Sequence, residues 1–359
     1  MTIATRHEPI LSIPTDDDHE QVVIRQDRET GLRFVVAVHS TVLGPALGGM
    51  RLKRYPGGLR EALDDVMALA RTMTLKASAA GLDLGGGKAV MIDDGNAQMR
   101  SARLEGAARV IDGLDGAYIT AEDIGTTTAD MDRMAQFTRY VVGRSVTNGG
   151  GGDPSPVTAE TVFQATRRGL TAATGSGDLS ERRVGVIGLG KVGSQLAAKL
   201  AGAGAEVIGC DLNPDSAARA AEQHGVRIAP SAEAILASEL DVLAPCAAGG
   251  QIDDALARSI DCRVVVGAAN NPLTDRGVAR VLMEREILYV PDFLANCGGL
   301  IHVAMEWYRE QAKTEAALIA GAMQRLDLAL ETAEAEGTPP IEVAERQALE
   351  RVEAARANR

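Results

Sequence analysis

The sequence contains few aromatic residues and few cysteines. Phe, Trp and Tyr make up 3% of its 359 residues, whereas hydrophobic residues together make up 45%. The chain can therefore build sizeable cores, which excludes wholesale disorder, but these cores must be aliphatic. The four cysteines lie far apart and include no Cys-x-x-Cys pair, so we expect neither a bound metal nor a disulfide framework.

Positive charge and long apolar runs are also scarce. Lys and Arg number 37 against 49 for Asp and Glu, which gives a net charge of −12. Such a chain offers a nucleic acid no basic surface and is repelled by an anionic membrane. It contains no apolar run of the roughly 18 residues that span a bilayer, and residues 1–20 lack the apolar stretch of a signal peptide. We therefore expect a cytoplasmic enzyme that acts on a small molecule and binds neither nucleic acid nor a membrane.

The order of periodic segments predicts an α/β fold, and the length suggests about two domains. Alternating segments at 21–24 and 32–38 predict strands, and the spacing of apolar residues at 59–76 predicts a helix. The glycine- and proline-rich stretch 148–156 predicts a loop near a domain boundary. Beyond it, short apolar runs alternate with helical segments, which is typical of a parallel sheet with helices on both faces. The C-terminal part predicts helices interrupted at 339–340.

A glycine-rich motif lies between a predicted strand at 184–187 and a predicted helix. Gly188 permits a tight turn, Gly190 lets backbone approach a pyrophosphate, and Gly193 lets the helix pack closely on the strand. The helix N-terminus favours the anion. Glycine triplets also arise by chance in a chain with 39 glycines, but here the flanking elements fall where the mechanism needs them. We therefore predict a dinucleotide-binding loop formed by Gly188, Leu189, Gly190, Lys191, Val192 and Gly193.

Asp211 ends the next predicted strand and selects the cofactor. A carboxylate at this place hydrogen-bonds the ribose hydroxyls of NAD and repels the 2′-phosphate of NADP, so NAD is the expected cofactor. Arg183 precedes the first strand of the unit instead of following the second, and gives no support to NADP. The alternative is that Asp211 is an ordinary turn residue, helped by Asn213 and Pro214.

Two lysines and a run of glycines form a second cluster. A phosphate-binding P-loop is excluded because Leu82 and Ala89 stand where that motif needs Gly and Ser or Thr. The glycines at 85–87 would instead let backbone approach a small substrate beside Lys88. If Lys76 and Lys88 share a cleft, each disfavours the other's ammonium form and burial adds to this effect, so one of them can act as a base. Sequence spacing alone favours the alternative that both are solvated surface lysines.

A third element is a predicted strand that ends in Glu122 and Asp123, followed by Gly and two Thr. This pattern has two interpretations. Asp123 is either the N-cap of a following helix or a carboxylate that projects into a cleft.

Eight short segments along the chain form a recognisable set. They lie at 43–51, 73–76, 84–88, 120–123, 154–158, 244–247, 267–271 and 296–299. In sequence, order and spacing, from about residue 21 to the C-terminal helices, they resemble the Glu/Leu/Phe/Val amino-acid dehydrogenases, and the leucine and valine enzymes more than the phenylalanine enzymes.

The resemblance implies an architecture and a reaction. An N-terminal α/β substrate and oligomerisation domain, 1–145, would precede a doubly wound Rossmann NAD-binding domain, 146–308, with the active site in the cleft between them. Helices at 309–359 would return toward the first domain, and the protein would be a homo-oligomer. The reaction would be reversible oxidative deamination, in which an amino acid, NAD and water give a 2-oxo acid, ammonia and NADH.

The resemblance also implies catalytic roles. Lys76 would pair with the substrate carboxylate. Lys88 would be the general base that activates water for attack on the imine intermediate. Asp123 would transfer protons and hold the lysine and the substrate amine in register. A neutral lysine beside a carboxylate stabilises a cationic imine better than two ammonium groups would.

Further contacts follow from the same resemblance. Backbone groups of Gly48 and Gly49 and the amide of Asn270 would assist Lys76. Thr158 would contact the nicotinamide carboxamide. The cofactor's path would be lined by Cys246, Ala247 and Asn270.

The residues expected around the substrate side chain are all apolar. Because none is cationic, glutamate is disfavoured and a branched-chain aliphatic substrate is expected. Ranking leucine, valine and isoleucine is unsafe, since one methylene is worth about 1–3 kcal/mol. The residues are Leu47, Met73, Ala121, Leu300 and Val303.

Alternatives remain open. Departures from the family pattern at Met50, Thr72, Leu75, Cys297 and Met305 permit an atypical substrate, including an aromatic one. Oxidoreduction of a 2-hydroxy acid is a second reaction class, which usually requires a His–carboxylate pair and an Arg. A non-catalytic NAD-binding protein is a third possibility, although it predicts loss of at least one proposed catalytic group. His302 has no matching role in the family and is expected to be packed or solvated.

Overall fold

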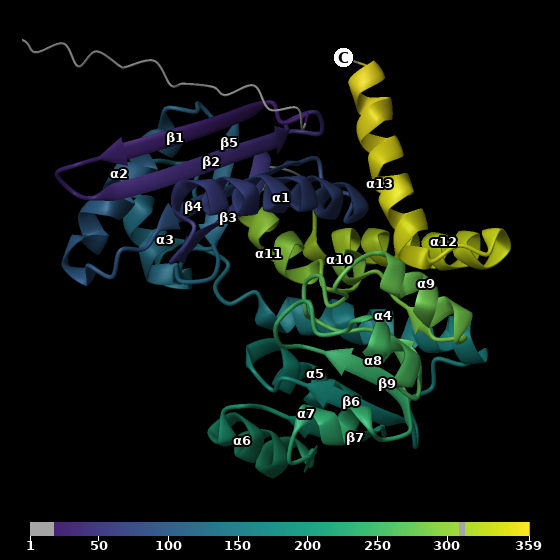
Figure 1. The fold of residues 1–359 in the computed structure, drawn as a ribbon. Coiled ribbons are helices and arrows are strands. Elements are labelled where there is room, and N and C mark those ends of the chain that lie inside the picture. Colours follow the sequence, from purple (N-terminus) through teal and green to yellow (C-terminus); the bar gives the residue numbers. More distant parts are fainter. Residues whose placement is uncertain (1–17, 309–312, 359) are drawn as a thin grey trace, which may run out of the picture. The chain divides into compact units, whose positions relative to one another are not determined.

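The computed structural model describes residues 18–308 and 313–358, which form two units. The first unit contains residues 18–78, 83–152 and 354–358, and the second contains the remaining described residues. Each unit has its own β-sheet with packed helices (Figure 1).

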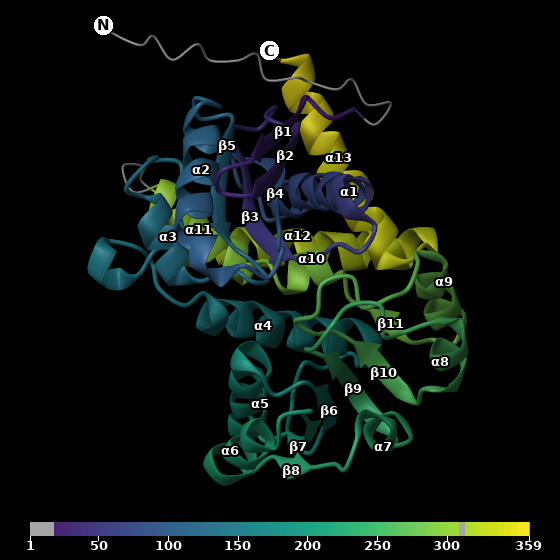
Figure 2. The same cartoon turned by 60° about the vertical axis from the view of Figure 1, so that its left-hand side comes forward.

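The first unit is built on a mixed five-stranded sheet in the order β1-β2-β4-β3-β5. β2 pairs antiparallel with β1 and β4, whereas β3 runs parallel to β4 and β5. α1 covers one face of this sheet and α2 the other (Figure 2). The elements are β1 (Gln21–Asp27), β2 (Leu32–Ser40), β3 (Ala46–Lys53), α1 (Gly58–Ala79), β4 (Gly85–Ile92), α2 (Arg100–Asp112), β5 (Tyr118–Glu122) and α3 (Thr128–Met134).

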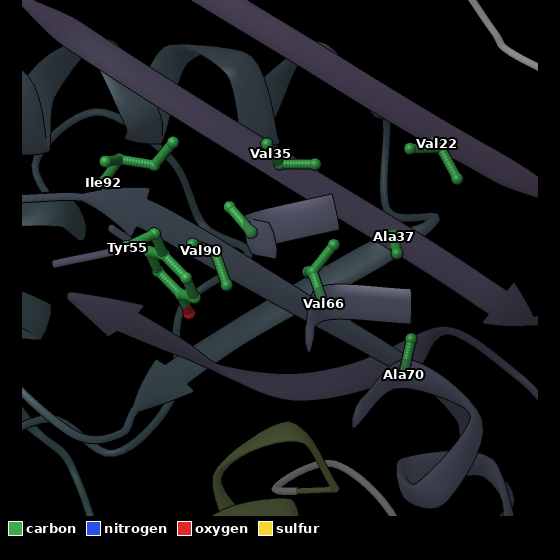
Figure 3. Close-up of a cluster of buried hydrophobic side chains, with 9 residues drawn as sticks. Val22, Val35, Ala37, Tyr55, Val66, Ala70, Val90 and Ile92 are labelled. Carbon is green, nitrogen blue, oxygen red and sulfur yellow. The ribbon is translucent and has the colours of Figure 1, made fainter. Parts of the chain in front are cut away.

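An aliphatic core fills the space between α1 and this sheet (Figure 3). Val35 of β2 and Val90 of β4 are direct partners in the sheet register, so their side chains point to the same face. α1 supplies a matching stripe because its small apolar residues recur every four positions. The cluster consists of Val22, Val35, Ala37, Tyr55, Ala62, Val66, Ala70, Val90 and Ile92.

The second unit contains a six-stranded sheet in which all strands are parallel, in the order β11-β10-β9-β6-β7-β8. The strand order reverses beside β6, which is where ligands bind in open parallel sheets. Its elements, with the C-terminal helix, are α4 (Ser155–Thr174), β6 (Arg183–Ile187), α5 (Lys191–Gly202), β7 (Glu206–Cys210), α6 (Pro214–His224), β8 (Arg227–Ile228), α7 (Ala232–Leu236), β9 (Leu240–Pro245), α8 (Asp254–Ser259), β10 (Cys262–Val265), α9 (Gly277–Glu284), β11 (Leu288–Tyr289), α10 (Asp292–Ala295), α11 (Gly298–Trp307), α12 (Glu315–Glu336) and α13 (Pro340–Ala357).

The main elements predicted from the sequence are confirmed. β1, β2 and α1 lie where periodicity predicts them, and the strand–turn–helix–strand unit spans 183–210. The helix break at 339–340 is also confirmed: Pro340 begins α13, where a missing N–H costs nothing. Within residues 18–308 and 313–358, no helix combines the length and hydropathy that crossing a bilayer requires.

Candidate active site

β4 places the Lys88 ammonium group in the interior of the first unit. Lys88 is only 5% exposed, and every residue of β4 is buried. Burial lowers the pKa of Lys88 below its ordinary value because it disfavours the charged form; Asp123 opposes this shift, and Arg51 adds to it. The interpretation of Lys88 as a solvated surface lysine is therefore wrong. Burial, one of the two causes that the sequence interpretation named, is the largest cause of its lowered pKa.

Asp123 follows β5 directly, and one of its carboxylate oxygens contacts two basic side chains. Its Oδ2 atom lies 3.0 Å from Nζ of Lys88 and accepts a hydrogen bond from Nε of Arg51 at 2.9 Å. Burial alone would raise the pKa of Asp123, but these two cations outweigh burial and lower it. Asp123 is therefore an ionised carboxylate paired with Lys88.

Asp123 is not the helix cap that the sequence left as an alternative. The N-cap of α3 is Thr127, whose side chain accepts from the backbone N–H of Asp130. The Asp130 carboxylate returns a bond to the backbone of Thr127, which completes a capping box.

Sheet register explains why Lys88 and Asp123 meet. Val90 pairs with Arg51 and Ala121 pairs with Gly49, so alternate residues of β3, β4 and β5 share the face that α1 covers. A Cβ atom on Gly49 would lie 2.8 Å from the Cβ of Asp123 and 2.7 Å from the carbonyl oxygen of Glu122. Glycine at 49 therefore allows Asp123 to approach this face.

Three further residues extend the pair into a network that the sequence interpretation missed. Nη1 of Arg51 donates to the Asp65 carboxylate at 3.1 and 3.3 Å, and the hydroxyl of Tyr55 donates to Oδ2 of Asp65 at 2.6 Å. The signal in the sequence was Arg51, two residues after Gly49, because the other residues of 46–52 are all uncharged. Its partner Asp65 lies on α1, and only the tertiary fold brings the two together.

The glycine run before Lys88 has a different role from the one predicted. Cβ atoms on Gly85–Gly87 would collide, in order, with the backbone of Ser40, the backbone of Thr74 and the ring of Tyr118. The chain itself fills the space beside these glycines, so the interpretation that they admit a substrate is wrong. They let β4 pack closely against its neighbours.

The other predicted site residues of this unit lie on β3, β5 and α1. Leu47 and Ala121 are buried. Cγ of Met73 would lie 3.4 Å from a Cβ on Gly48, so these two positions are in contact. Lys76 is one helical turn after Met73 on α1 and is partly exposed.

The glycine-rich loop of the second unit has the features of a dinucleotide site. Gly188 has a φ of +100°, which favours glycine, and a Cβ on Gly193 would collide with the carbonyl oxygen of Gly188. Nothing lies within 4 Å of a Cβ on Gly190, the N-cap of α5, which has no side-chain cap. A cavity of about 330 Å³ adjoins Gly190 and is bordered by Lys191 and Arg219. Open backbone at a helix N-terminus beside cationic side chains fits a pyrophosphate.

Asp211 connects this loop to the end of β7. Its Oδ2 accepts from the backbone N–H of Leu189 at 2.7 Å, and its Oδ1 accepts from the N–H of Asn213 at 2.7 Å. Asn213 in turn caps α6. The carboxylate thus orders the glycine-rich loop as well as the turn, which matches the turn role that the sequence left as an alternative, whereas its role toward the ribose stays a prediction.

A rigid turn carries Asn270. Nδ2 of the buried Asn296 donates to Oδ1 of Asn270 at 3.1 Å, so the Nδ2 group of Asn270 is turned away from Asn296. The next residue, Asn271, has a φ of +48°, and its N–H donates to the buried Asp292 at 2.7 Å. The sequence singled out Asn270 but not the Asp292 support behind it.

The remaining predicted cofactor and substrate contacts also lie in the second unit. Cys246 and Ala247 follow β9 and pack against the glycine-rich loop. The hydroxyl of Thr158 donates to the carbonyl of Pro154 at 3.0 Å. Leu300 and Val303 are buried residues of α11.

His302 of α11 pairs with a carboxylate. Its Nδ1 lies 2.7 Å from Oε2 of Glu315, at the start of α12. This pair joins two helices, in line with the packed role expected for His302.

A parallel-sheet dinucleotide unit joined to a unit with a buried lysine–aspartate pair defines a pyridine-nucleotide-dependent dehydrogenase. Models of protein families agree with this class. The Glu/Leu/Phe/Val dehydrogenase dimerisation domain matches residues 19–140, and the Glutamate/Leucine/Phenylalanine/Valine dehydrogenase model matches 214–359. The NAD-binding domain of D-isomer specific 2-hydroxyacid dehydrogenases matches 159–248.

Known proteins resemble the chain over nearly its whole length. It is 41% identical to a leucine dehydrogenase of Thermoactinomyces intermedius, over 95% of this chain and 93% of that protein. It is 43% identical to a valine dehydrogenase of Streptomyces virginiae, over 94% and 95% of the two chains. The L-tryptophan dehydrogenase structure from Nostoc punctiforme matches with a TM-score of 0.81 and 29% identity, over 95% of this chain and 98% of that one. The chain therefore belongs to the Glu/Leu/Phe/Val dehydrogenase family.

Proposed function

We propose that this chain catalyses the reversible, NAD-dependent oxidative deamination of a branched-chain L-amino acid to the 2-oxo acid and ammonia. The observation that carries the proposal is the buried Lys88 amine held 3.0 Å from Asp123. Relatives named leucine and valine dehydrogenase, at about 40% identity, support the same reaction and NAD as the cofactor.

Lys88 and Asp123 would carry the proton transfers. A neutral Lys88 amine can take a proton from the water that attacks the imine carbon, and burial favours this neutral form. When Lys88 is neutral, the Arg51 guanidinium still lowers the pKa of Asp123 and favours its ionised form, so the pair has one negative charge and stabilises the cationic imine. The proton gained by Lys88 can pass through Asp123 to the amine of the resulting carbinolamine. Lys88, neutral again, then takes the hydroxyl proton as the C=O bond forms and the C–N bond breaks, so that the 2-oxo acid and ammonia are released.

The other residues would bind and orient the substrate. Lys76 pairs with the substrate carboxylate, assisted by backbone groups of Gly48 and Gly49 and by the amide of Asn270. The bond from Asn296 supports this role, because it holds Oδ1 of Asn270 and so fixes the orientation of the side-chain amide.

The glycine-rich loop would hold the cofactor. Gly188, Gly190 and Gly193 offer backbone to the pyrophosphate, and Asp211 offers its carboxylate to the adenosine ribose. When bound, NAD accepts two electrons from the substrate's α-carbon. The contacts proposed to complete the site are Lys191, Val192, Thr158, Cys246, Ala247 and Asn270.

An apolar side-chain pocket would select the substrate. The proposed residues include no cation, and burying a glutamate carboxylate among them without a partner would be costly. An aromatic amino acid is the second candidate, because the chain resembles a tryptophan dehydrogenase at 29% identity. The higher identity to leucine and valine enzymes favours the branched-chain substrates. The proposed pocket residues are Leu47, Met73, Ala121, Leu300 and Val303.

We also propose the division of labour along the chain. Residues 1–145 would bind substrate and form the oligomer, and residues 146–308 would bind NAD. The protein would act in the cytoplasm. The match of 19–140 to a family model described as a dimerisation domain supports a homo-oligomer.

A substrate panel tests the proposed function. NADH formation is followed by absorbance with leucine, valine, isoleucine, phenylalanine, tryptophan and glutamate at equal concentrations. We expect the highest kcat/KM with a branched-chain amino acid. Preference for glutamate, or no NADH with any amino acid, contradicts the proposal.

A further inference from the structure

We propose that Arg51 is a positioning residue that, anchored by Asp65 and Tyr55, fixes the Asp123 carboxylate and keeps Lys88 in its neutral, base-competent form. This inference rests on the proposed function, since it explains how the same lysine comes to act as a base. All five residues belong to the first unit.

The guanidinium of Arg51 bridges two carboxylates. Its Nε donates to Asp123 at 2.9 Å, while its Nη1 donates to Asp65 at 3.1 Å. Because the guanidinium is a rigid, planar fork, fixing one side fixes the other. Asp123 is thereby held relative to α1, which carries Asp65, as well as to its own strand.

The far end of the network is anchored in the apolar core. The ring of Tyr55 lies in the cluster between α1 and the sheet (Figure 3) and is 6% exposed. Burial, with the hydrogen bond to Asp65, raises the pKa of Tyr55 above its ordinary value, so the phenol remains a donor. Tyr55 therefore restrains Asp65, and Asp65 restrains Arg51.

Arg51 also competes with Lys88 for the same atom. Both cations contact Oδ2 of Asp123, and neither of these contacts uses Oδ1. Without Arg51, the full charge of Asp123 would stabilise the Lys88 ammonium group. With Arg51 present, part of that charge is already compensated, and the positive guanidinium repels a second positive charge nearby.

The charge balance agrees with this role. The charged groups with the largest effect on the pKa of Lys88 are Asp123, Arg51 and Asp65. With Lys88 protonated, the four groups are neutral overall, whereas with Lys88 neutral they have one net negative charge. The neutral amine thus creates an anionic site that complements a cationic substrate nitrogen. Arg51 itself stays charged: burial disfavours its cation, but Asp123 and Asp65 outweigh burial and raise its pKa.

Arg51→Gln tests the proposal through its pH profile. Losing the positive charge and leaving Asp123 entirely to Lys88 both favour the ammonium form. We therefore expect the acidic limb of log kcat/KM against pH to move to higher pH by about one unit or more. Arg51→Lys retains the charge but cannot bridge two carboxylates. We therefore expect its acidic limb to lie at nearly the same pH as that of the wild type, and its kcat/KM to be reduced.

A second readout does not depend on turnover. Cyanate carbamylates only neutral amines, so the pH dependence of Lys88 modification, measured by mass spectrometry of its peptide, reports the protonation of this amine. We expect half-maximal modification at a higher pH in Arg51→Gln than in the wild type. Arg60→Gln is the matched control, because Arg60 lies on the surface of α1 with 87% of its side chain exposed and should leave both profiles unchanged.

The outcomes separate the two proposals. A wild-type enzyme that turns over no amino acid contradicts the proposed function, whatever Arg51 does. Suppose instead that the wild type is active and Arg51→Gln is less active, but neither the acidic limb nor the cyanate profile moves. Arg51 then has only a structural role, and the proposal that it keeps Lys88 neutral is contradicted. If Arg51→Gln does not fold, Arg51→Lys tests the charge argument. An acidic limb that moves by a full pH unit in this variant, which retains the positive charge, would contradict the argument.

Discussion

At the residue scale, Lys88 combines burial with a single carboxylate partner that it shares with an arginine. Lys88→Ala should reduce kcat by roughly 10²–10⁴-fold, the range that a general base contributes, while NAD affinity remains near that of the wild type. Steady-state kinetics and NADH fluorescence titration measure the two quantities. Lys199→Ala removes a lysine that pairs with Glu160 in the other unit and serves as the control. Unchanged turnover of Lys88→Ala would remove this residue from the base role.

Gly49 makes a second prediction at this scale. An added methyl group would meet both Glu122 and Asp123, so Gly49→Ala should displace the carboxylate. A shift of about 1 Å in a catalytic group can cost about 100-fold in rate, and we expect a kcat loss of that order. Gly202→Ala is the control, because nothing lies within 4 Å of its Cβ position. Equal kcat values for the two variants would contradict the role of Gly49.

The sequence could predict part of the site at this scale. It singled out Lys88, Asp123 and the glycines of the dinucleotide loop, because short motifs specify these residues. It could not predict that Arg51 meets Asp65, since these residues lie on different elements that only the packing of α1 on the sheet brings together. Nor could it choose between the two interpretations of Asp123, which depend on the register of β3 and β5.

At the element scale, the glycine-rich loop and the end of β7 are held together by Asp211. Asp211→Ala removes a carboxylate next to the expected ribose site and a hydrogen-bond acceptor for Leu189. We expect the ratio of kcat/KM with NAD to that with NADP to fall by about tenfold or more, since a hydrogen bond to a charged group is worth about 1.5–3 kcal/mol. Kinetics with both cofactors provides the measurement. An unaltered ratio would exclude Asp211 from cofactor selection.

Elements with a clear apolar period were predictable, whereas β3 was not. Its residues Gly48 and Gly49 are poor strand formers, and pairing with β4 and β5 on both sides makes this segment a strand. The role of the glycine run in β4 was likewise not predictable, because it depends on residues outside the run. Tight packing against Thr74 and Tyr118, which a local pattern does not contain, requires those glycines.

At the scale of the whole molecule, the two units hold different parts of the chemistry. The ionisable network lies in the mixed-sheet unit, and the dinucleotide loop lies in the parallel-sheet unit. Membership of the Glu/Leu/Phe/Val dehydrogenase family joins these parts in one reaction. The match of 159–248 to hydroxyacid dehydrogenases concerns the NAD-binding domain alone, and under the proposed function the lysine–aspartate pair distinguishes the two chemistries.

Dependence on ammonia tests the central claim most directly. NADH oxidation is followed with a branched-chain 2-oxo acid at saturating concentration while ammonia is varied from none to excess, and the product is identified by chromatography. We predict no oxidation without ammonia, saturable oxidation with it, and the branched-chain L-amino acid as the product. Oxidation of NADH without ammonia, with a 2-hydroxy acid as the product, would contradict the account.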